Sequence, residues 1–383
     1  MFIVLANATV ALYPQGGGHW MWFLQYPLGL KALGHRVFWL EILPSTGNPE
    51  KDRYLIAKFF ERLAAYGLDG NAAVVVTKDP PLQNFEHAEF HGTSPAKILE
   101  VARDADLLWS FWYSLGDPLL SRFRRRAFID VDPGHLHVCI AEGVMNIGKH
   151  DAYLTVGVNV NEPECKIPTA GLKWRPFLPF VYLPLWEFSS DPGSDAPFTS
   201  ITQWTWETLE YNGQIVSVSK RDAYLKYLEL PQLTRRPFEL AVNIGENDPG
   251  GDRRLLHAHG WSLVNPHRIA HTPDAYREYI RNSRAEFLCP KPIHVDWNTG
   301  WFSERSAAYL ASGRPVVAGD TGFTRYLPTG RGLFAFHNLK DASAAVAEID
   351  ADYMLHGRAA REIAEAYFDS RACIEAMIAA SQL

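Results

Sequence analysis

Short apolar runs alternate with helix-forming stretches through the first half of the chain. Over 20–33 the apolar positions recur at helical spacing, and helices are also expected over 51–66 and 94–105. The apolar runs are typical of strands and read FIVL (2–5), RVFWLEI (36–42), AAVVVT (72–77), DLLWSFW (106–112), RRAFIDVD (125–132) and DAYLTVG (151–157). This alternation predicts a parallel sheet with crossover helices.

The pattern breaks over 186–198, which is rich in Ser, Asp, Pro and Gly and has the character of a linker. Beyond it the alternation resumes, with expected strands at TSITQW (199–204), FELAVNI (238–244), GWSLVN (260–265), AEFLCP (285–290), RPVVAG (314–319) and GLFAF (332–336). We therefore predict an α/β protein of two Rossmann-like domains, 1–187 and 198–357, with a deep cleft between them. Residues 358–383 are expected to form two helices, divided at Asp369-Ser370, that pack back on the first domain.

The amino-acid composition argues against a nucleic-acid-binding protein and against a membrane protein. The 383 residues are 47% hydrophobic and carry a formal net charge of −6, so no broad surface for nucleic acid is expected. No apolar run approaches the roughly 20 residues that a membrane-spanning helix needs. Four scattered cysteines lack CxxC spacing, which fits a reducing, cytoplasmic location.

Three glycines, Gly16–Gly18, stand between the first strand and the first helix and are followed by His19. A glycine turn lets backbone amides approach a ligand, although a plain turn is equally open. A lone histidine is usually structural, but ligands of open α/β sheets bind beyond the strand carboxyl ends. His19 is therefore a candidate to take a proton from a hydroxyl group. Pro27 should kink the following helix or start a new one, and Gly34 should end it.

The stretch NTGWFSERSAAYLASGRPVVAGDTGF, 298–323, carries most of the candidate chemistry. Ser303 is the predicted N-cap of a helix whose free amides form a phosphate cradle. Arg305 in the first turn opposes the helix dipole and needs an anion, either Glu304 or, as we favour, a ligand phosphate. Asp320 and Thr321 are placed to bond sugar hydroxyls, with a plain turn as the alternative.

Two further clusters carry charge. Asp130, Asp132, His135 and His137 follow one strand, but their spacing matches no firm metal template. Asp132 is expected to orient His19, to contact an acceptor or to belong to a structural turn. Lys220-Arg221 precedes a helix of the second domain and is either a solvated helix start or a cationic pair for a leaving diphosphate.

These motifs resemble the GT-B glycosyltransferases. In family-1 members one Gly-His pair precedes a helix and a second precedes strand two, as Gly18-His19 and Gly34-His35 do here. Their HCGWNS…E…G-PVV segment is similar to NTGWFSERSAAYLASGRPVV. Asn298 and Ser306 depart from it at the family's histidine and ribose-binding glutamate, and the likeness is greater to bacterial glycosyltransferase-like proteins.

The resemblance implies His19 as the catalytic base, Ser303 as a contact to donor phosphate, and a Lys220-Arg221 pair like that of retaining enzymes, which work without a metal. Together with the local patterns it gives catalytic residues His19 and Asp132 and a donor site of Gly17, Gly18, Lys220, Arg221, Asn298, Thr299, Gly300, Trp301, Ser303, Glu304, Arg305, Ser306, Asp320, Thr321, Gly322 and Phe323.

The implied activity is transfer of a sugar from a nucleotide-diphosphate sugar, such as a UDP-sugar, to a small-molecule or glycan acceptor. Residues 1–187 would bind the acceptor and 198–357 the donor, with no metal and no further cofactor. Two alternatives are an epimerase of the same fold, using His19 with Asp132, and a degenerate binding protein, suggested by Asn298 and Ser306.

Overall fold

The computed structural model describes residues 1–113, 115–245 and 247–382. A first lobe is built on an eight-stranded sheet in the order β4-β3-β2-β1-β5-β6-β7-β8. Its strands are β1 (Phe2–Ala6), β2 (Arg36–Pro44), β3 (Ala72–Thr77), β4 (Glu89–His91), β5 (Leu107–Ser110), β6 (Arg126–Asp130), β7 (Ala152–Thr155) and β8 (Trp174–Pro176). Every pairing is parallel except β3 with β4, which confirms the predicted parallel sheet.

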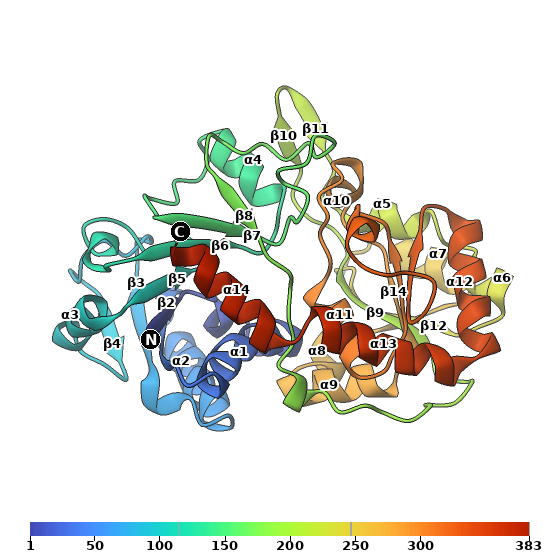
Figure 1. Ribbon diagram of the computed structural model, residues 1–383, viewed down its shortest axis with the longest axis horizontal. Helices are drawn as coiled ribbons and strands as arrows, with labels where there is room; N and C mark the ends of the chain where they lie inside the picture. Colours follow the sequence, from blue (N-terminus) through green and yellow to red (C-terminus); the bar gives the residue numbers. More distant parts are fainter. Residues whose placement is uncertain (114, 246, 383) are drawn as a thin grey trace.

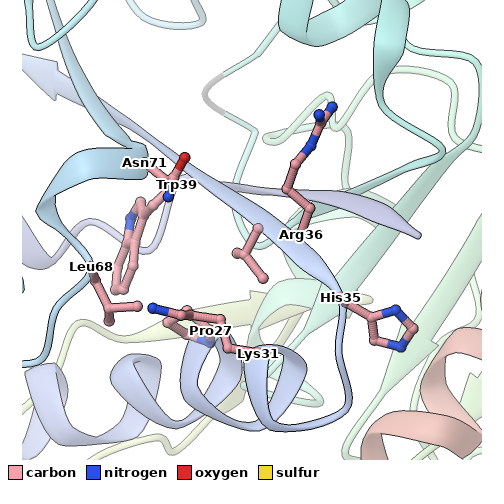
Figure 2. Close-up of a pocket in the computed structure, with 8 residues that line it drawn as sticks. Pro27, Lys31, His35, Arg36, Trp39, Leu68 and Asn71 are labelled. Atoms are coloured by element: carbon pink, nitrogen blue, oxygen red, sulfur yellow. The ribbon is translucent and has the colours of Figure 1, made fainter.

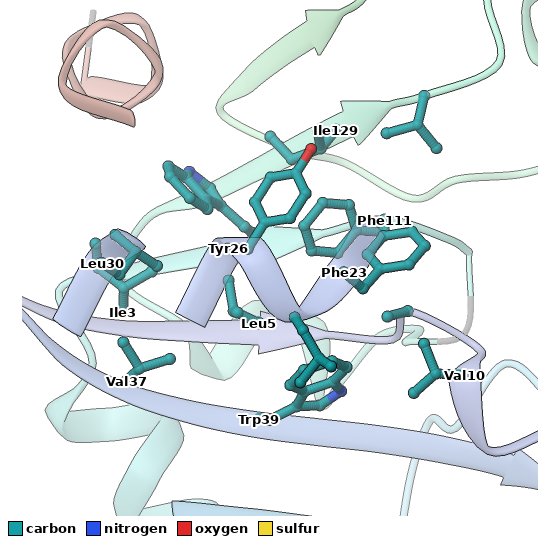
Figure 3. Close-up of a cluster of buried hydrophobic side chains, with 14 of the residues drawn as sticks. Ile3, Leu5, Val10, Phe23, Tyr26, Leu30, Val37, Trp39, Phe111 and Ile129 are labelled. Atoms are coloured by element: carbon teal, nitrogen blue, oxygen red, sulfur yellow. The ribbon is translucent and has the colours of Figure 1, made fainter. Parts of the chain in front are cut away.

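The first lobe's helices are α1 (Gly17–Ala32), α2 (Pro49–Ala64), α3 (Pro95–Asp104) and α4 (His135–Ala141). Phe23 and Tyr26 of α1 pack edge-on against Phe111, which follows β5, and Figure 3 shows their rings beside it. Helix α1 continues through Pro27 as one element, so the proline starts no new helix. Gly34 follows the helix with φ of 80°, as a residue that ends a helix does.

A second lobe is built on a six-stranded parallel sheet in the order β13-β12-β9-β14-β15-β16. Its strands are β9 (Phe198–Gln203), β12 (Phe238–Asn243), β13 (Trp261–Val264), β14 (Ala285–Leu288), β15 (Val316–Gly319) and β16 (Leu333–Phe336). Its helices are α5 (Lys220–Leu225), α6 (Leu230–Thr234), α7 (Asp252–Ala258), α8 (Pro266–Ile269), α9 (Pro273–Asn282), α10 (Pro292–Asp296), α11 (Glu304–Ala311), α12 (Leu339–Ala351) and α13 (Tyr353–Tyr367). The hairpin β10 (Leu209–Tyr211) and β11 (Gln214–Val216) was not expected from the sequence.

The two C-terminal helices pack on different lobes. Helix α14 (Ser370–Gln382) crosses to the first lobe and packs on α1 and β7, as expected, and Figure 1 shows both chain ends there. Helix α13 instead stays on α11 of the second lobe, which corrects the prediction for that helix. Its apolar face, with Ala360 and Ala364, is small enough to lie close against α11. No helix among the described residues is long and apolar enough to cross a membrane.

Candidate functional site

The carboxyl ends of both sheets face each other, since loops that follow strands of the two lobes contact one another. Lys291, after β14, donates from Nζ to Asp132, after β6, at 2.6 Å. The amide of Asn159, after β7, donates to the carbonyl of Thr299 at 3.1 Å. Ligands of open α/β sheets bind at this edge, so it is the candidate site.

The glycine turn packs against the second lobe. The amide of Gly17 donates to the carbonyl of Ala270 at 2.9 Å. A Cβ on Gly18 would lie 2.9 Å from the ring of Tyr276 in α9. Close approach of two helices therefore needs both glycines, and Gly17 does not offer its amide to a ligand. The prediction that the Gly17 amide faces a ligand is therefore wrong. The predicted contact between Gly18 and the donor stays a prediction.

His19 lies in the first turn of α1 with Nε2 3.0 Å from the carbonyl oxygen of Ala8. Its ring is edge-on to Tyr13 and Phe23, at centroid distances of 5.2 and 5.1 Å. Burial lowers the pKa of His19 to about 4, with the Ala8 carbonyl opposing the shift. The imidazole is thus neutral near pH 7. Because a carbonyl only accepts, the proton sits on Nε2 and Nδ1 keeps a lone pair.

Asp132 does not orient His19, which corrects that part of the sequence interpretation. Its Oδ2 accepts from Lys291, and its Oδ1 lies 3.7 Å from Nε2 of His294. Burial opposes ionisation, yet Lys291 and His294 outweigh it and hold the pKa of Asp132 at about 2. The carboxylate is therefore one half of an ion pair between the lobes.

The neighbouring acidic and imidazole groups have structural partners. Buried Asp130 accepts from Thr155 Oγ1 at 2.5 Å and lies 3.1 Å from Nε2 of His137. His137 stacks on Trp174 at a centroid distance of 4.1 Å. Among the described residues no group of three or more His, Cys, Asp and Glu side chains is arranged to hold a metal ion.

The start of α11 is the centre of a buried polar network. Ser303 is 1% exposed, and its Oγ accepts from the amide of Arg305 at 3.2 Å, so it is the predicted N-cap. Arg305 Nε donates to Glu286 Oε1 at 2.6 Å, and Ser306 Oγ donates to the other oxygen of that carboxylate. Glu286, on β14, is completely buried.

The anion that Arg305 needs is therefore Glu286, not Glu304 and not primarily a ligand. Burial would lower the pKa of Arg305, but Glu286 outweighs it and raises that pKa. Its Nη2 is nevertheless buried without a hydrogen-bond partner in the described part of the chain. Sequence reasoning missed Glu286, because a glutamate inside an apolar strand carries no sign of which helix it will face.

Lys220 begins α5 and is half-buried. Burial, together with the nearby charges of Arg305 and Lys291, lowers the pKa of Lys220 to about 7. No described side chain is hydrogen-bonded to its ammonium group. Glu304 is half-buried at the start of α11. Burial raises the pKa of its carboxyl group, and the charges of Arg305 and Lys220 reduce this rise. Charged groups of both signs therefore lie together at the start of α11, and not all of them have a hydrogen-bond partner among the described residues.

Arg221, unlike Lys220, is paired with a carboxylate. Its Nε and Nη2 donate to the two oxygens of Asp252, at 2.7 and 2.8 Å. The predicted Lys220-Arg221 pair is therefore divided, because neighbouring residues at a helix start project in different directions.

Two loops predicted to hold the donor are locked to each other and to the first lobe. Asn298 and Gly300 have φ of 50° and 68°. Asn159 Nδ2 donates to the carbonyls of Asn298 and Gly322, at 3.2 and 3.3 Å. Asp320 accepts from the Gly322 amide at 2.8 Å.

The remaining side chains of these loops are also engaged within the protein. Thr321 donates to the carbonyl of Trp301, and Thr299 donates to the carbonyl of His294. The ring of Trp301 stacks on His294 at 4.6 Å, and Phe323 is buried. In the structure these residues form turns whose polar groups bond within the protein, which is the alternative that the sequence left open. Their contacts to a donor sugar stay predictions.

Cavities of different size lie near these residues, and the one lined by Trp204, Arg221 and Asp252 has a volume of about 460 Å³. One of about 150 Å³ is lined by Asp320, Cys289 and His337 at the carboxyl ends of the strands. Ligand pockets are usually about 300 Å³ or more, so it would hold one ring-sized group. The cavity of Figure 2 lies between Pro27, Arg36 and Leu68, where β2 begins, and hence at the opposite edge of the sheet.

No family profile and no curated protein matches the sequence. Several solved structures share its fold over nearly the whole chain. An alpha-glucosyltransferase in complex with UDP and DNA has a TM-score of 0.61 at 12% identity, covering 100% of this chain and 99% of that one. Sucrose-phosphate synthase from Thermosynechococcus elongatus has a TM-score of 0.54 at 13% identity, over 98% and 96% of the two chains. Anabaena HepE, in complex with UDP and glucose, has a TM-score of 0.53 at 12% identity, over 99% of each chain.

The chain therefore has the GT-B fold, as predicted. Because one neighbour was solved with DNA, the expectation of no broad nucleic-acid surface stays a prediction.

Proposed function

We propose that this protein is a glycosyltransferase that moves a sugar from a nucleotide-diphosphate sugar to a small-molecule or glycan acceptor. The observation that carries the proposal is Lys220, an incompletely paired ammonium group held near Arg305 and the start of α11. It stands where the carboxyl ends of both sheets of a GT-B fold meet. Four unpaired cysteines are consistent with a cytoplasmic enzyme.

Chemically, the reaction leaves negative charge on the diphosphate. Fixed cations and helix amides stabilise such charge more strongly in a half-buried site than in water. Lys220, the free Nη2 of Arg305 and the first amides of α11 supply these groups, so the reaction needs no metal. Separation of the lobes would make room for the donor, because the cavity of about 150 Å³ beside Asp320 is too small for a nucleotide sugar.

His19 would use its Nδ1 lone pair at the reacting sugar. A base with a pKa of about 4 removes a hydroxyl proton less well than one poised near neutral pH. The low pKa therefore favours a contact to the transferred sugar, as in a retaining enzyme, over the role of acceptor base. The epimerase alternative is weakened because Asp132 pairs with Lys291 and not with His19.

The test is isothermal titration of UDP, GDP and dTDP into wild type, Lys220→Met and Lys340→Met. Lys340 is an exposed lysine of the same lobe and serves as the matched control. We expect binding of at least one nucleotide, with a loss of roughly thirtyfold or more in Lys220→Met, because a half-buried charge pair is lost. Lack of binding by all three nucleotides, or equal loss in both variants, would contradict the proposal.

The matching sugar nucleotide is then incubated with and without a panel of acceptors. Sugar appearing on an acceptor identifies a transferase. An isomerised donor in the absence of acceptor would instead identify an epimerase, and binding without either product would identify a binding protein.

A further inference from the structure

Glu41 is a carboxylate in the middle of β2 with no exposed surface. Acidic side chains are almost never buried so completely unless their oxygens are bonded. No cation of the described chain pairs with it. The reason for a glutamate inside this apolar strand must lie in neutral donors.

One donor belongs to the loop between β1 and α1, and the other belongs to β2 itself. Glu41 Oε1 accepts from the amide of Ala11 at 2.9 Å, and Oε2 accepts from Trp39 Nε1 at 3.1 Å. Burial raises the pKa of Glu41 to about 7, and the amides of Ala11, Ala8 and Val10 together with the Trp39 indole limit the rise. The Glu41 carboxylate thus holds the loop between β1 and α1 against β2 through hydrogen bonds to backbone amides.

A second clamp holds the other end of the same loop. Asn7 Oδ1 accepts from the amide of Ile42, the residue after Glu41, at 3.1 Å. Asn7 and Thr9, on either side of Ala8, have φ of 34° and 55°. Residues other than glycine rarely adopt this region, and they keep it where the surroundings impose it.

The clamped loop presents the carbonyl of Ala8, which accepts the Nε2 proton of His19 at 3.0 Å. The direction of that carbonyl fixes the tautomer and the orientation of the imidazole. A chain of contacts therefore runs from Glu41 through the loop to the ring of His19.

We propose that Glu41 is a positioning residue that holds His19 with Nδ1 free for the transferred sugar. Glu41 touches no substrate itself and acts through residues 7–11. The inference rests on the proposed function for the role of His19, but the positioning can be measured without it.

The experiment records ¹⁵N signals of the histidine rings, with His19 assigned by loss of its signals in His19→Gln. In wild type we expect a neutral ring protonated on Nε2 alone. In Glu41→Gln one of the two accepting oxygens is replaced by an NH₂ group, which faces one of the two N–H donors. The loop loosens, and the His19 signals shift towards the average of both tautomers.

Asp52→Asn is the matched control. Asp52 is another nearly buried carboxylate of the first lobe, and it holds the loop of Ser45 and Thr46. This change should leave the His19 signals in place. If Glu41→Gln does not fold, the same His19 signals are recorded in Asn7→Gly. Glycine tolerates the positive φ at this position, and the change removes the hydrogen bond between Asn7 and Ile42.

In the transfer reaction, kcat of Glu41→Gln should fall roughly ten- to a hundredfold, as for a misplaced reacting group, while the nucleotide Kd stays unchanged. Unaltered His19 signals in both Glu41→Gln and Asn7→Gly would overturn the inference. Shifted signals in a protein that binds no nucleotide would support the positioning and reject only the proposed function.

Discussion

At the scale of single residues, burial decides which groups hold charge. Glu286 is completely buried, yet the Arg305 guanidinium and the Ser306 hydroxyl each donate to one of its carboxylate oxygens. Lys220 lacks such a partner, and its pKa falls to about 7. With a pKa near 7, part of the Lys220 population is a neutral amine, which takes up a proton when an anion binds beside it. The proposed donor site thus has a measurable property.

We therefore expect proton uptake when a UDP-sugar binds at about pH 8, because Lys220 is then mostly neutral in the free protein. At about pH 6 it is already charged, and no uptake is expected. Affinity should fall by up to tenfold per pH unit above pH 7. Titration calorimetry in buffers of different ionisation enthalpy measures the uptake, since a UDP-sugar itself carries no group that titrates there.

Lys220→Met should abolish that uptake, and Lys340→Met should keep it. Uptake that persists in Lys220→Met would come from another group, such as Glu304, and would contradict the assignment to Lys220.

At the scale of elements, α1 links the lobes. Its glycine start lies against α9, while Phe23 and Tyr26 pack on the first sheet (Figure 3). A helix that fits both lobes at once needs small residues at the contact and large ones in the core. The glycines are thus a packing feature of the interface.

Gly18→Ala should lower the free energy of unfolding by about 1–3 kcal/mol, because its Cβ would press on the buried ring of Tyr276. Urea unfolding measures this loss. Gly70→Ala is the control, since nothing lies within 4 Å of its Cβ. A gain of about 1 kcal/mol at Gly18, as for an unhindered helical glycine, would show that α1 is not in close contact with α9.

At the scale of the whole molecule, charge pairs join the lobes around the site. Asp132 pairs with Lys291, and Arg325 of the second lobe pairs with Glu162 and Glu164 of the first, at 2.7 and 2.9 Å. The Arg325 pairs are exposed and therefore weak and salt-sensitive. The Arg325 pairs should accordingly add little to the free energy that holds the lobes together.

Combining Asp132→Asn with Arg325→Gln should increase the radius of gyration in the absence of ligand, as measured by X-ray scattering. High salt should expand wild type more than this variant. Asp151→Asn, which removes an ion pair within the first lobe, should leave the radius unchanged. An unchanged radius in the double variant would show that the apolar contacts alone keep the lobes closed.

Much of the fold followed from local pattern. Strands such as AAVVVT, the helix cap at Ser303 and the division at Asp369-Ser370 all appear in the structure as predicted. These features depend on neighbours within a few residues, and periodicity and capping chemistry report such neighbours directly. The parallel alternation was likewise sufficient for the architecture of the two sheets.

Tertiary structure alone decided the partners of the charged groups. Arg305 meets Glu286, Asp132 meets Lys291, and Glu41 meets the amide of Ala11, each across a long stretch of chain. Side chains find such partners only when strands and loops distant in sequence are brought together, and the spacing of residues carries no record of that contact. The sequence by itself determined most of the elements and predicted the sheet edge as the ligand site; the folded chain decided which polar groups at that edge pair within the protein.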